Sequence, residues 1–169
     1  DRSPSRGLGD VYKRQGLKKD PSMSSLVAES GAQIVLMHNT GDPRYEDVVS
    51  DVISDLEGTV AKAIKCGVDP TKIIIDPGIG FAKNSEQNLE IIRRLGEFKR
   101  LGYPILIGTS RKSTIGTVLD LPVDQRLEGT AATVALSIAN GADVIRVHDV
   151  KEMSRVATMA DAVVRGWSH

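Results

Sequence analysis

The sequence predicts an α/β fold in which parallel strands alternate with helices. The predicted strands are apolar along almost their whole length, which is typical of a parallel sheet covered by helices. Each strand is followed by a longer segment with apolar residues at helical spacing, and polar residues gather where each strand ends. The four predicted strands are 34–38, 73–76, 104–108 and 144–148.

The polar strand ends favour a TIM barrel, (β/α)8, because such barrels keep their chemistry at the carboxyl ends of the strands. A complete barrel needs ~250 residues and eight units, whereas this chain has 169 residues. We therefore expect its four units to be the last four of eight, a half barrel. An open doubly wound sheet is disfavoured because Gly78-Ile79-Gly80 is followed by Phe81-Ala82-Lys83, which misses the dinucleotide-binding fingerprint.

The first fifteen residues do not share this pattern. Residues 1–15 mix Arg, Ser, Gly and Pro without apolar periodicity. We expect them to form a disordered or foreign leader outside the fold. The barrel segment is then 16–169, and it starts with a short helix near Ser22–Ser30 before the first strand.

The longer helices follow from apolar spacing and from their end signals. Asn84 is a good N-cap residue with Glu86 and Gln87 behind it, while Gly67 and Gly141 follow helix ends. The expected helices are 45–65, 84–101, 124–140 and 151–165.

The last predicted helix should pack its apolar residues against the rest of the fold. Residues expected to be buried there are Val156, Met159, Ala160, Val163, Val164 and Trp167.

Composition excludes several classes of protein. Lys and Arg number 22 and so do Asp and Glu, so no overall field attracts nucleic acid or an anionic membrane, and any anion site must be local. The single cysteine, Cys66, excludes an internal disulfide and a cysteine-based metal cluster, and it fits a reducing cytoplasm. No apolar run approaches membrane-spanning length.

Arg146 and His148 are the most informative pair in the chain. They are two residues apart in the last predicted strand, so they share one face while Ile145 and Val147 take the other. An arginine keeps its charge, and its unpaired burial is prohibitive, so this face must meet an anion or water. The pair predicts a phosphate site; the alternative is an ion pair of Arg146 with Asp143 or Asp149.

Two further strand ends carry polar groups. Asp76 could accept hydrogen bonds from a ring with adjacent N–H donors or act as a base, or it could simply cap the following turn. Lys112, within Ser110-Arg111-Lys112-Ser113, could bind an anion or an electron-rich ligand, or belong to a solvated basic turn. Phe81 could stack on a flat ligand or cover the barrel rim.

Barrels often bind phosphate in the loops after their last two strands. In a chain that holds the last four units, these loops are the ones with Lys112 and with Arg146 and His148. The expected fold and the charges therefore point to the same place.

Four motifs, in this order, resemble the dihydropteroate synthase family of pterin-binding TIM barrels, the targets of sulfonamides in folate biosynthesis. The resemblance covers about 16–167. The motifs are Leu36-Met37-His38, Ile75-Asp76-Pro77-Gly78-Ile79-Gly80-Phe81, Gly108-Thr109-Ser110-Arg111-Lys112-Ser113 and Arg146-Val147-His148-Asp149-Val150.

The resemblance implies a transferase that joins 6-hydroxymethyl-7,8-dihydropterin diphosphate to p-aminobenzoate and releases diphosphate. It implies that Asp76 anchors the pterin, that Lys112 contacts the pterin near the p-aminobenzoate pocket, and that Met37 packs on the pterin. Further implied roles are p-aminobenzoate binding by Phe81 and Ser113, and diphosphate binding by Arg146 and His148, with Lys112, Arg146 and His148 as the catalytic set.

The family also uses Mg²⁺, and the expected metal-binding Asn would lie in the N-terminal half of the barrel. The motif expected just before Gly16 is absent, since Asp10-Val11-Tyr12-Lys13-Arg14-Gln15 stands there. We therefore expect a C-terminal fragment that has little or no activity alone, while the full enzyme would be a homodimer. The alternatives are a pterin-binding methyltransferase domain linked to a corrinoid protein and a non-catalytic pterin-binding fragment.

Overall fold

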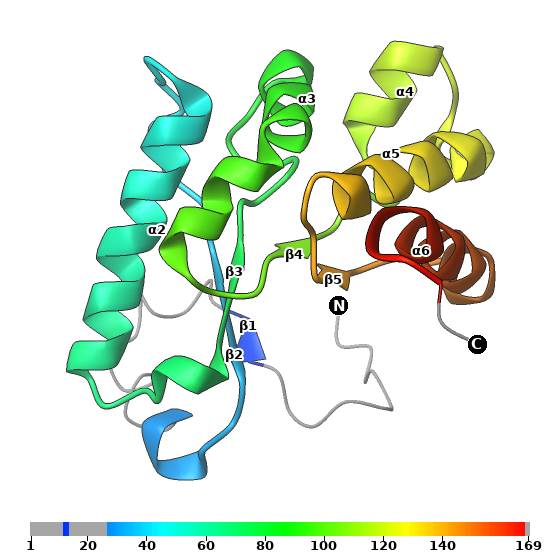
Figure 1. The fold of residues 1–169 in the computed structure, drawn as a ribbon. Coiled ribbons are helices and arrows are strands. Elements are labelled where there is room, and N and C mark those ends of the chain that lie inside the picture. The colour runs from blue at the N-terminus through cyan, green and yellow to red at the C-terminus, as the bar shows by residue number, and fades with distance from the viewer. Residues whose placement is uncertain (1–11, 14–26, 168–169) are drawn as a thin grey trace.

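The computed structural model describes residues 12–13 and 27–167 and contains parallel strands flanked by helices (Figure 1). One sheet has the order β1-β2-β3 and the other pairs β4 with β5, all in parallel. A parallel bridge between Ile75 and Ile105 connects the two sheets. The strands thus lie side by side in chain order, as β1 (Tyr12–Lys13), β2 (Ile34–Met37), β3 (Ile73–Asp76), β4 (Leu106–Ile107) and β5 (Val144–Ile145).

The helices follow one another along one side of these strands (Figure 1). Residues 27–30 are helical and precede β2. The α-helices after them are α2 (Val48–Lys65), α3 (Ser85–Arg93), α4 (Ser113–Leu119), α5 (Leu127–Ala139) and α6 (Val150–Arg165). Short 3₁₀ helices are η1 (Pro70–Lys72), η2 (Leu95–Leu101) and η3 (Val123–Gln125).

The strands place alternate residues on two faces. One face packs against α2, α3 and η2 in the main apolar core. Isoleucine and leucine dominate the strand side of that core: Ile34, Leu36, Ile73, Ile75, Ile105 and Ile107. Their neighbours Met37, Asp76 and Leu106 therefore point to the opposite face of the sheet.

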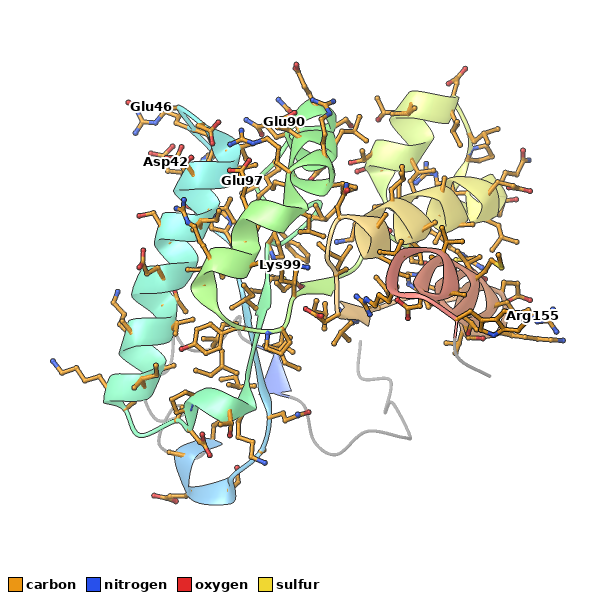
Figure 2. The ribbon with its side chains drawn as sticks, in the orientation of Figure 1. Asp42, Glu46, Glu90, Glu97, Lys99 and Arg155 are labelled. Carbon is orange, nitrogen blue, oxygen red and sulfur yellow. The ribbon has the colours of Figure 1, made fainter. Side chains whose placement is uncertain are left out.

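Charged side chains hold α2 and α3 together at one end. Arg94 donates to Asp47, the N-cap residue of α2, over 2.7 Å and to Glu97 over 2.7 Å. Figure 2 shows Glu90 and Glu97 on the α3–η2 segment, near Glu46 at the start of α2. This network fixes how the two helices approach each other above β2 and β3.

The strand–helix order is confirmed, with several changes of boundary. The helix expected over 84–101 consists of α3 and the separate η2, although Asn84 does cap α3 in a capping box with Gln87. The strand expected to reach His148 ends at Ile145. Its partner β4 ends at Ile107, and the Arg146 N–H donates to the Ile107 carbonyl as the last backbone hydrogen bond between the two segments.

The boundary of the expected leader also changes. Tyr12 and Lys13, which we assigned to a leader outside the fold, form β1 and pair in register with Ile34 and Val35; two residues are too few to show periodicity. Residues 1–11 and 14–26, including most of the helix expected at 22–30, lie outside the described residues.

The apolar residues expected to be buried on α6 are mostly exposed. Met153 is the buried residue of this helix, and Val156 and Ala160 are half-buried. Exposure reaches 65% at Met159 and 73% at Val163, and Val164 and Trp167 are exposed as well. Helical spacing identifies an apolar stripe on a helix but not the surface that packs against it. No described element covers the apolar stripe of α6.

Candidate functional site

The predicted site residues from three strands share one face of the sheet. Met37 and Asp76 are direct register partners on β2 and β3. Val144 is the partner of Leu106, so Arg146, two residues on, takes the same face as Asp76. Ile145 and Val147 pack on the other side, against the apolar cluster of α5 and α6. The predicted alternation of Arg146 with its apolar neighbours is confirmed.

Asp76 is a buried carboxylate at the end of β3, 7% exposed. Its Oδ1 accepts a hydrogen bond of 2.8 Å from Gly78 N–H, so it does cap the turn. Burial raises the pKa of Asp76, whereas the charges of Lys112 and Lys83 lower it. A carboxylate has about four acceptor positions, so capping leaves capacity for a ligand with N–H donors.

Gly78 fixes the turn after β3. Its φ is +74°, and a Cβ there would lie 2.0 Å from the carbonyl oxygen of His38. His38 N–H in turn donates to the Asp76 carbonyl over 2.9 Å. A side chain at this position would therefore force apart the strand ends that carry Met37 and Asp76.

Lys112 and Phe81 lie together, as the resemblance implies. Lys112 is the N-cap residue of α4, and its Nζ lies 4.8 Å from the centroid of the Phe81 ring and donates to the Ile79 carbonyl. Burial lowers the pKa of Lys112 and the charge of Asp76 raises it. Ser113 follows as the exposed first residue of α4. This arrangement offers a cation and a flat ring beside Asp76.

Arg146 and His148 are both exposed. The alternative ion pairs of Arg146 are not formed, because Asp149 pairs with Arg111 and Asp143 accepts from Ile105 N–H over 2.9 Å. His148 Nδ1 lies 2.9 Å from Ser110 Oγ. Ser110 is in the loop that also carries Lys112, so this contact joins the two basic segments.

Two polar residues of the site region were not predicted. Lys83 extends back towards β2, with its Nζ 2.8 Å from His38 Nδ1. Asn88, which is 1% exposed, accepts from Gly80 N–H over 2.8 Å and donates to Thr114 Oγ1 over 3.0 Å. A buried Asn on an amphipathic helix is a possible sign of such a role, but helical spacing alone does not show which loop it meets.

The site region has no evident metal centre within the described ranges. No group of three or more His, Cys, Asp or Glu residues there could hold an ion.

None of the helices in the described part of the chain has the length and apolar character to cross a bilayer.

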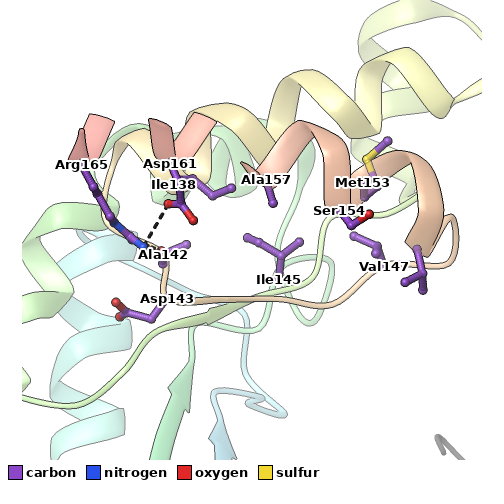
Figure 3. Close-up of a pocket in the computed structure, with 11 residues that line it drawn as sticks. Ile138, Ala142, Asp143, Ile145, Val147, Met153, Ser154, Ala157, Asp161 and Arg165 are labelled. Atoms are coloured by element: carbon purple, nitrogen blue, oxygen red, sulfur yellow. Dashed lines mark hydrogen bonds and ion pairs between the residues drawn. The ribbon is translucent and has the colours of Figure 1, made fainter. Parts of the chain in front are cut away.

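A separate apolar hollow of ≈ 250 Å³ lies between β5 and α6 (Figure 3). Ile138, Ile145 and Val147 line it, and an ion pair between Arg165 and Asp161 lies at one side. Because Ile145 and Val147 face away from Arg146, this hollow is distinct from the site.

Comparisons with known proteins identify the family of the chain. The pterin-binding enzyme family matches residues 9–148. Dihydropteroate synthase of Bacillus subtilis is 50% identical over 157 residues, which are 93% of this chain and 54% of the relative. That of Clostridium beijerinckii is 48% identical over 159 residues, 94% of this chain and 58% of the relative. The chain thus spans little more than half the length of these relatives.

Solved structures of the same enzyme have the same fold. Dihydropteroate synthase of Clostridium difficile, crystallised in the presence of pteroic acid, has a TM-score of 0.86 and 46% identity over 92% of this chain and 60% of that one. The Xanthomonas albilineans enzyme with 4-aminobenzoic acid has a TM-score of 0.86 and 34% identity over 90% of this chain and 57% of that one. The similarity assigns the β/α units to a TIM-barrel fold, and the chain belongs to the family of pterin-binding enzymes.

Proposed function

We propose that this chain provides the C-terminal half of a dihydropteroate synthase, which joins 6-hydroxymethyl-7,8-dihydropterin diphosphate to p-aminobenzoate and releases diphosphate. The observation that carries the proposal is the common sheet face of Asp76 and Arg146, with Lys112 close to Asp76. An acceptor for ring N–H groups and a cation for a phosphate are thereby available to one ligand. The curated relatives favour this reaction over a corrinoid-linked methyl transfer.

The family resemblance suggests the pterin and p-aminobenzoate subsites, and the positions of the residues support them. Asp76 accepts hydrogen bonds from the amino and ring N–H groups of the pterin, and Met37, its register partner, packs on the ring. Phe81 and Ser113 line the p-aminobenzoate subsite on either side of Lys112. In this proposed arrangement the aniline nitrogen lies next to the pterin methylene carbon.

Charge stabilisation of the leaving group is the main demand of the reaction. The bond from the methylene carbon to the diphosphate oxygen breaks, and the diphosphate takes the electron pair. The aniline nitrogen then forms the new bond to that carbon and loses a proton. Arg146 and His148 hold the diphosphate as its charge develops, which is the role of preorganised donors in such transition states.

The Mg²⁺ expected for the family would add charge at the diphosphate. The described residues do not fit a metal site, since they contain no cluster of His, Cys, Asp or Glu that could hold it. We therefore assign no step of the reaction to the metal within this part of the chain.

The half-barrel arrangement is part of the proposal. Within the described residues, β1 pairs only with β2 and β5 only with β4, so both outer edges are available to further parallel strands. The relatives are nearly twice as long as the matched region. We expect the 169-residue chain to bind the pterin substrate and to form little or no dihydropteroate alone.

Isothermal titration calorimetry with two ligands tests the proposal. The chain should bind 6-hydroxymethyl-7,8-dihydropterin diphosphate, and Asp76→Ala should weaken binding at least about tenfold, the equivalent of one charge-assisted hydrogen bond. Arg146→Ala should weaken binding of the pterin that carries the diphosphate. It should leave the affinity for 6-hydroxymethyl-7,8-dihydropterin, which lacks the diphosphate, unchanged. Lys62→Ala, an exposed change on α2, is the control.

Three outcomes would contradict it. Absence of pterin binding by the unchanged chain would rule out a pterin as its substrate. An equal effect of Arg146→Ala on both ligands would remove its diphosphate role. Rapid product formation by this chain with p-aminobenzoate and Mg²⁺ would disprove the need for further barrel units.

We also propose that the exposed apolar face of α5 and α6 forms the homodimer contact of the complete enzyme. It contains Leu136, Met159, Val163 and Val164, and Arg155 borders it. Figure 2 shows Arg155 extending away from the fold on α6. An apolar face of this kind on a folded protein commonly marks an interface.

A further inference from the structure

The ammonium group of Lys83 is enclosed by acceptors from the strand ends and the loop after β3. Its Nζ donates to the Gly78 carbonyl over 3.2 Å and to the Phe81 carbonyl over 3.0 Å, and it lies 2.8 Å from His38 Nδ1. An ammonium has three N–H donors and no acceptor, so the histidine nitrogen accepts here. All three donors are used within the protein, and none remains for a ligand.

Lys83 is connected to Asp76 through a single residue. The carbonyl of Gly78 accepts from Lys83, while the N–H of Gly78 donates to Asp76 Oδ1 over 2.8 Å. Gly78 has little freedom to move towards β2, since even a Cβ on it would lie 2.0 Å from the His38 carbonyl oxygen. The position of the Asp76 carboxylate therefore depends on a turn that Lys83 holds.

The two groups also interact through their charges. Burial raises the pKa of Asp76, and the positive charges of Lys112 and Lys83 oppose this rise. Burial lowers the pKa of Lys83 to about 8, which leaves it mostly charged at neutral pH, and the charge of Asp76 opposes that shift.

Other titratable groups face Lys83 from the neighbouring elements. Asp55 on α2 raises the pKa of Lys83 and Lys112 lowers it, while the Tyr45 ring centroid lies 6.0 Å from its Nζ. Of the two lysines beside Asp76, Lys112 contacts the proposed ligand, and Lys83 acts through the protein.

We propose that Lys83 is a positioning residue of the pterin site, which holds the Asp76 carboxylate in place through Gly78 and supplies a fixed positive charge beside it. The ligand named here rests on the proposed function, whereas the effect of Lys83 on Asp76 does not. Removing a lysine ammonium from water is costly, and the role accounts for a half-buried ammonium in a loop that neutral donors could also have closed.

The ligand-free protein provides the first test. The carboxyl ¹³C signal of Asp76 is followed by NMR against pH in the unchanged chain, in Lys83→Met and in Lys62→Met, which removes an exposed charge on α2. The Asp76 midpoint should move to higher pH in Lys83→Met and stay in place in Lys62→Met. An unchanged midpoint in a folded Lys83→Met protein would overturn the proposal, because a merely structural lysine would alter stability only.

Lys83→Gln covers the case in which Lys83→Met does not fold. Glutamine keeps an N–H donor for the loop but has no charge, so the Asp76 midpoint should still rise. If it does not rise in this variant, the charge of Lys83 has no role.

Pterin binding provides the second readout. Binding needs the ionised carboxylate, so affinity falls as pH drops through the Asp76 midpoint, and Lys83→Met should move this fall to higher pH. At pH values just below the Asp76 midpoint, Lys83→Met should bind the pterin about tenfold more weakly than the unchanged chain does. If the unchanged chain binds no pterin, the proposed function fails, and the ligand-free titration still decides the role of Lys83.

Discussion

Gly78 is the residue on which the geometry of the site depends most directly. Its N–H reaches Asp76, its carbonyl reaches Lys83, and its φ of +74° is one that residues with a Cβ rarely adopt. It also allows β2 and the turn after β3 to approach closely. One position therefore combines a conformational and a steric requirement.

Gly78→Ala should destabilise the fold by about 3 kcal/mol or more, the sum of a left-handed backbone penalty and a steric displacement. Gly31→Ala is a matched control, because Gly31 has φ +62° but no atom within 4 Å of the added Cβ; it should cost only about 1–2 kcal/mol. Urea unfolding of both variants measures the difference. Equal losses would show that the approach of His38 to Gly78 has no energetic consequence.

The sequence predicts the site residues that end strands and misses those that support them. Asp76 and Arg146 stand out because a charge interrupts an apolar run. Lys83 lies in a loop outside any apolar strand run, and only the folded turn shows that its side chain is directed back towards His38. The roles assigned to Met37 and Phe81 came from the family resemblance, since an apolar side chain near a strand end has no distinctive pattern.

At the scale of elements, a buried amide joins α3 to the loop after β3 and to α4. Asn88 on α3 accepts from Gly80 in the Asp76 loop and donates to Thr114 on α4. The loop with Phe81 and the helix that starts after Lys112 therefore have a common support, and the cation and ring contact of these two residues depends on it.

Asn88→Leu should cost about 1–3 kcal/mol, because it leaves the buried Thr114 hydroxyl without its partner and also removes the acceptor of the Gly80 N–H. Asn84→Ala removes only the N-cap of the same helix and should cost about 1 kcal/mol. Thermal or urea unfolding measures both. In tryptic digestion, the Asn88 variant should also be cut faster in the loop around Lys83; unchanged loop protection would contradict the coupling.

The order of strands and helices follows from periodicity, but the boundaries depend on partners. Residues 146–148 continue the alternation of β5, yet the strand ends at Ile145 because its partner β4 ends at Ile107. The break between α3 and η2 at Arg94 likewise has no signal in the apolar spacing. It places Arg94 where it reaches both Asp47 and Glu97.

At the scale of the whole molecule, apolar surface remains uncovered on α5 and α6. Leu136 is 57% exposed and Trp167 is 73% exposed. The sequence predicted the apolar residues of α6 but placed them in the core, since a pattern within one chain cannot distinguish burial in the fold from burial between copies.

Val163→Glu should therefore reduce self-association of the chain by at least about tenfold in dissociation constant, because a charge would have to be buried in an apolar contact. Sedimentation velocity over a range of concentrations measures the effect. Thr117→Glu, an exposed change on α4 away from this face, is the control. Identical sedimentation of all three proteins would contradict the dimer contact.

Side chains along β3 alternate between the face that packs against the helices and the face of the proposed ligand site, so neighbouring residues serve different purposes. Ile75 is fully buried against the helices, and the next side chain, Asp76, belongs to the ligand side. Trimming Ile75 to valine would loosen the helix layer without removing the proposed pterin anchor, whereas replacing Asp76 would remove that anchor and also the acceptor that caps the Gly78 turn. A protein engineer could thus adjust heat resistance at Ile75 without changing the proposed recognition group.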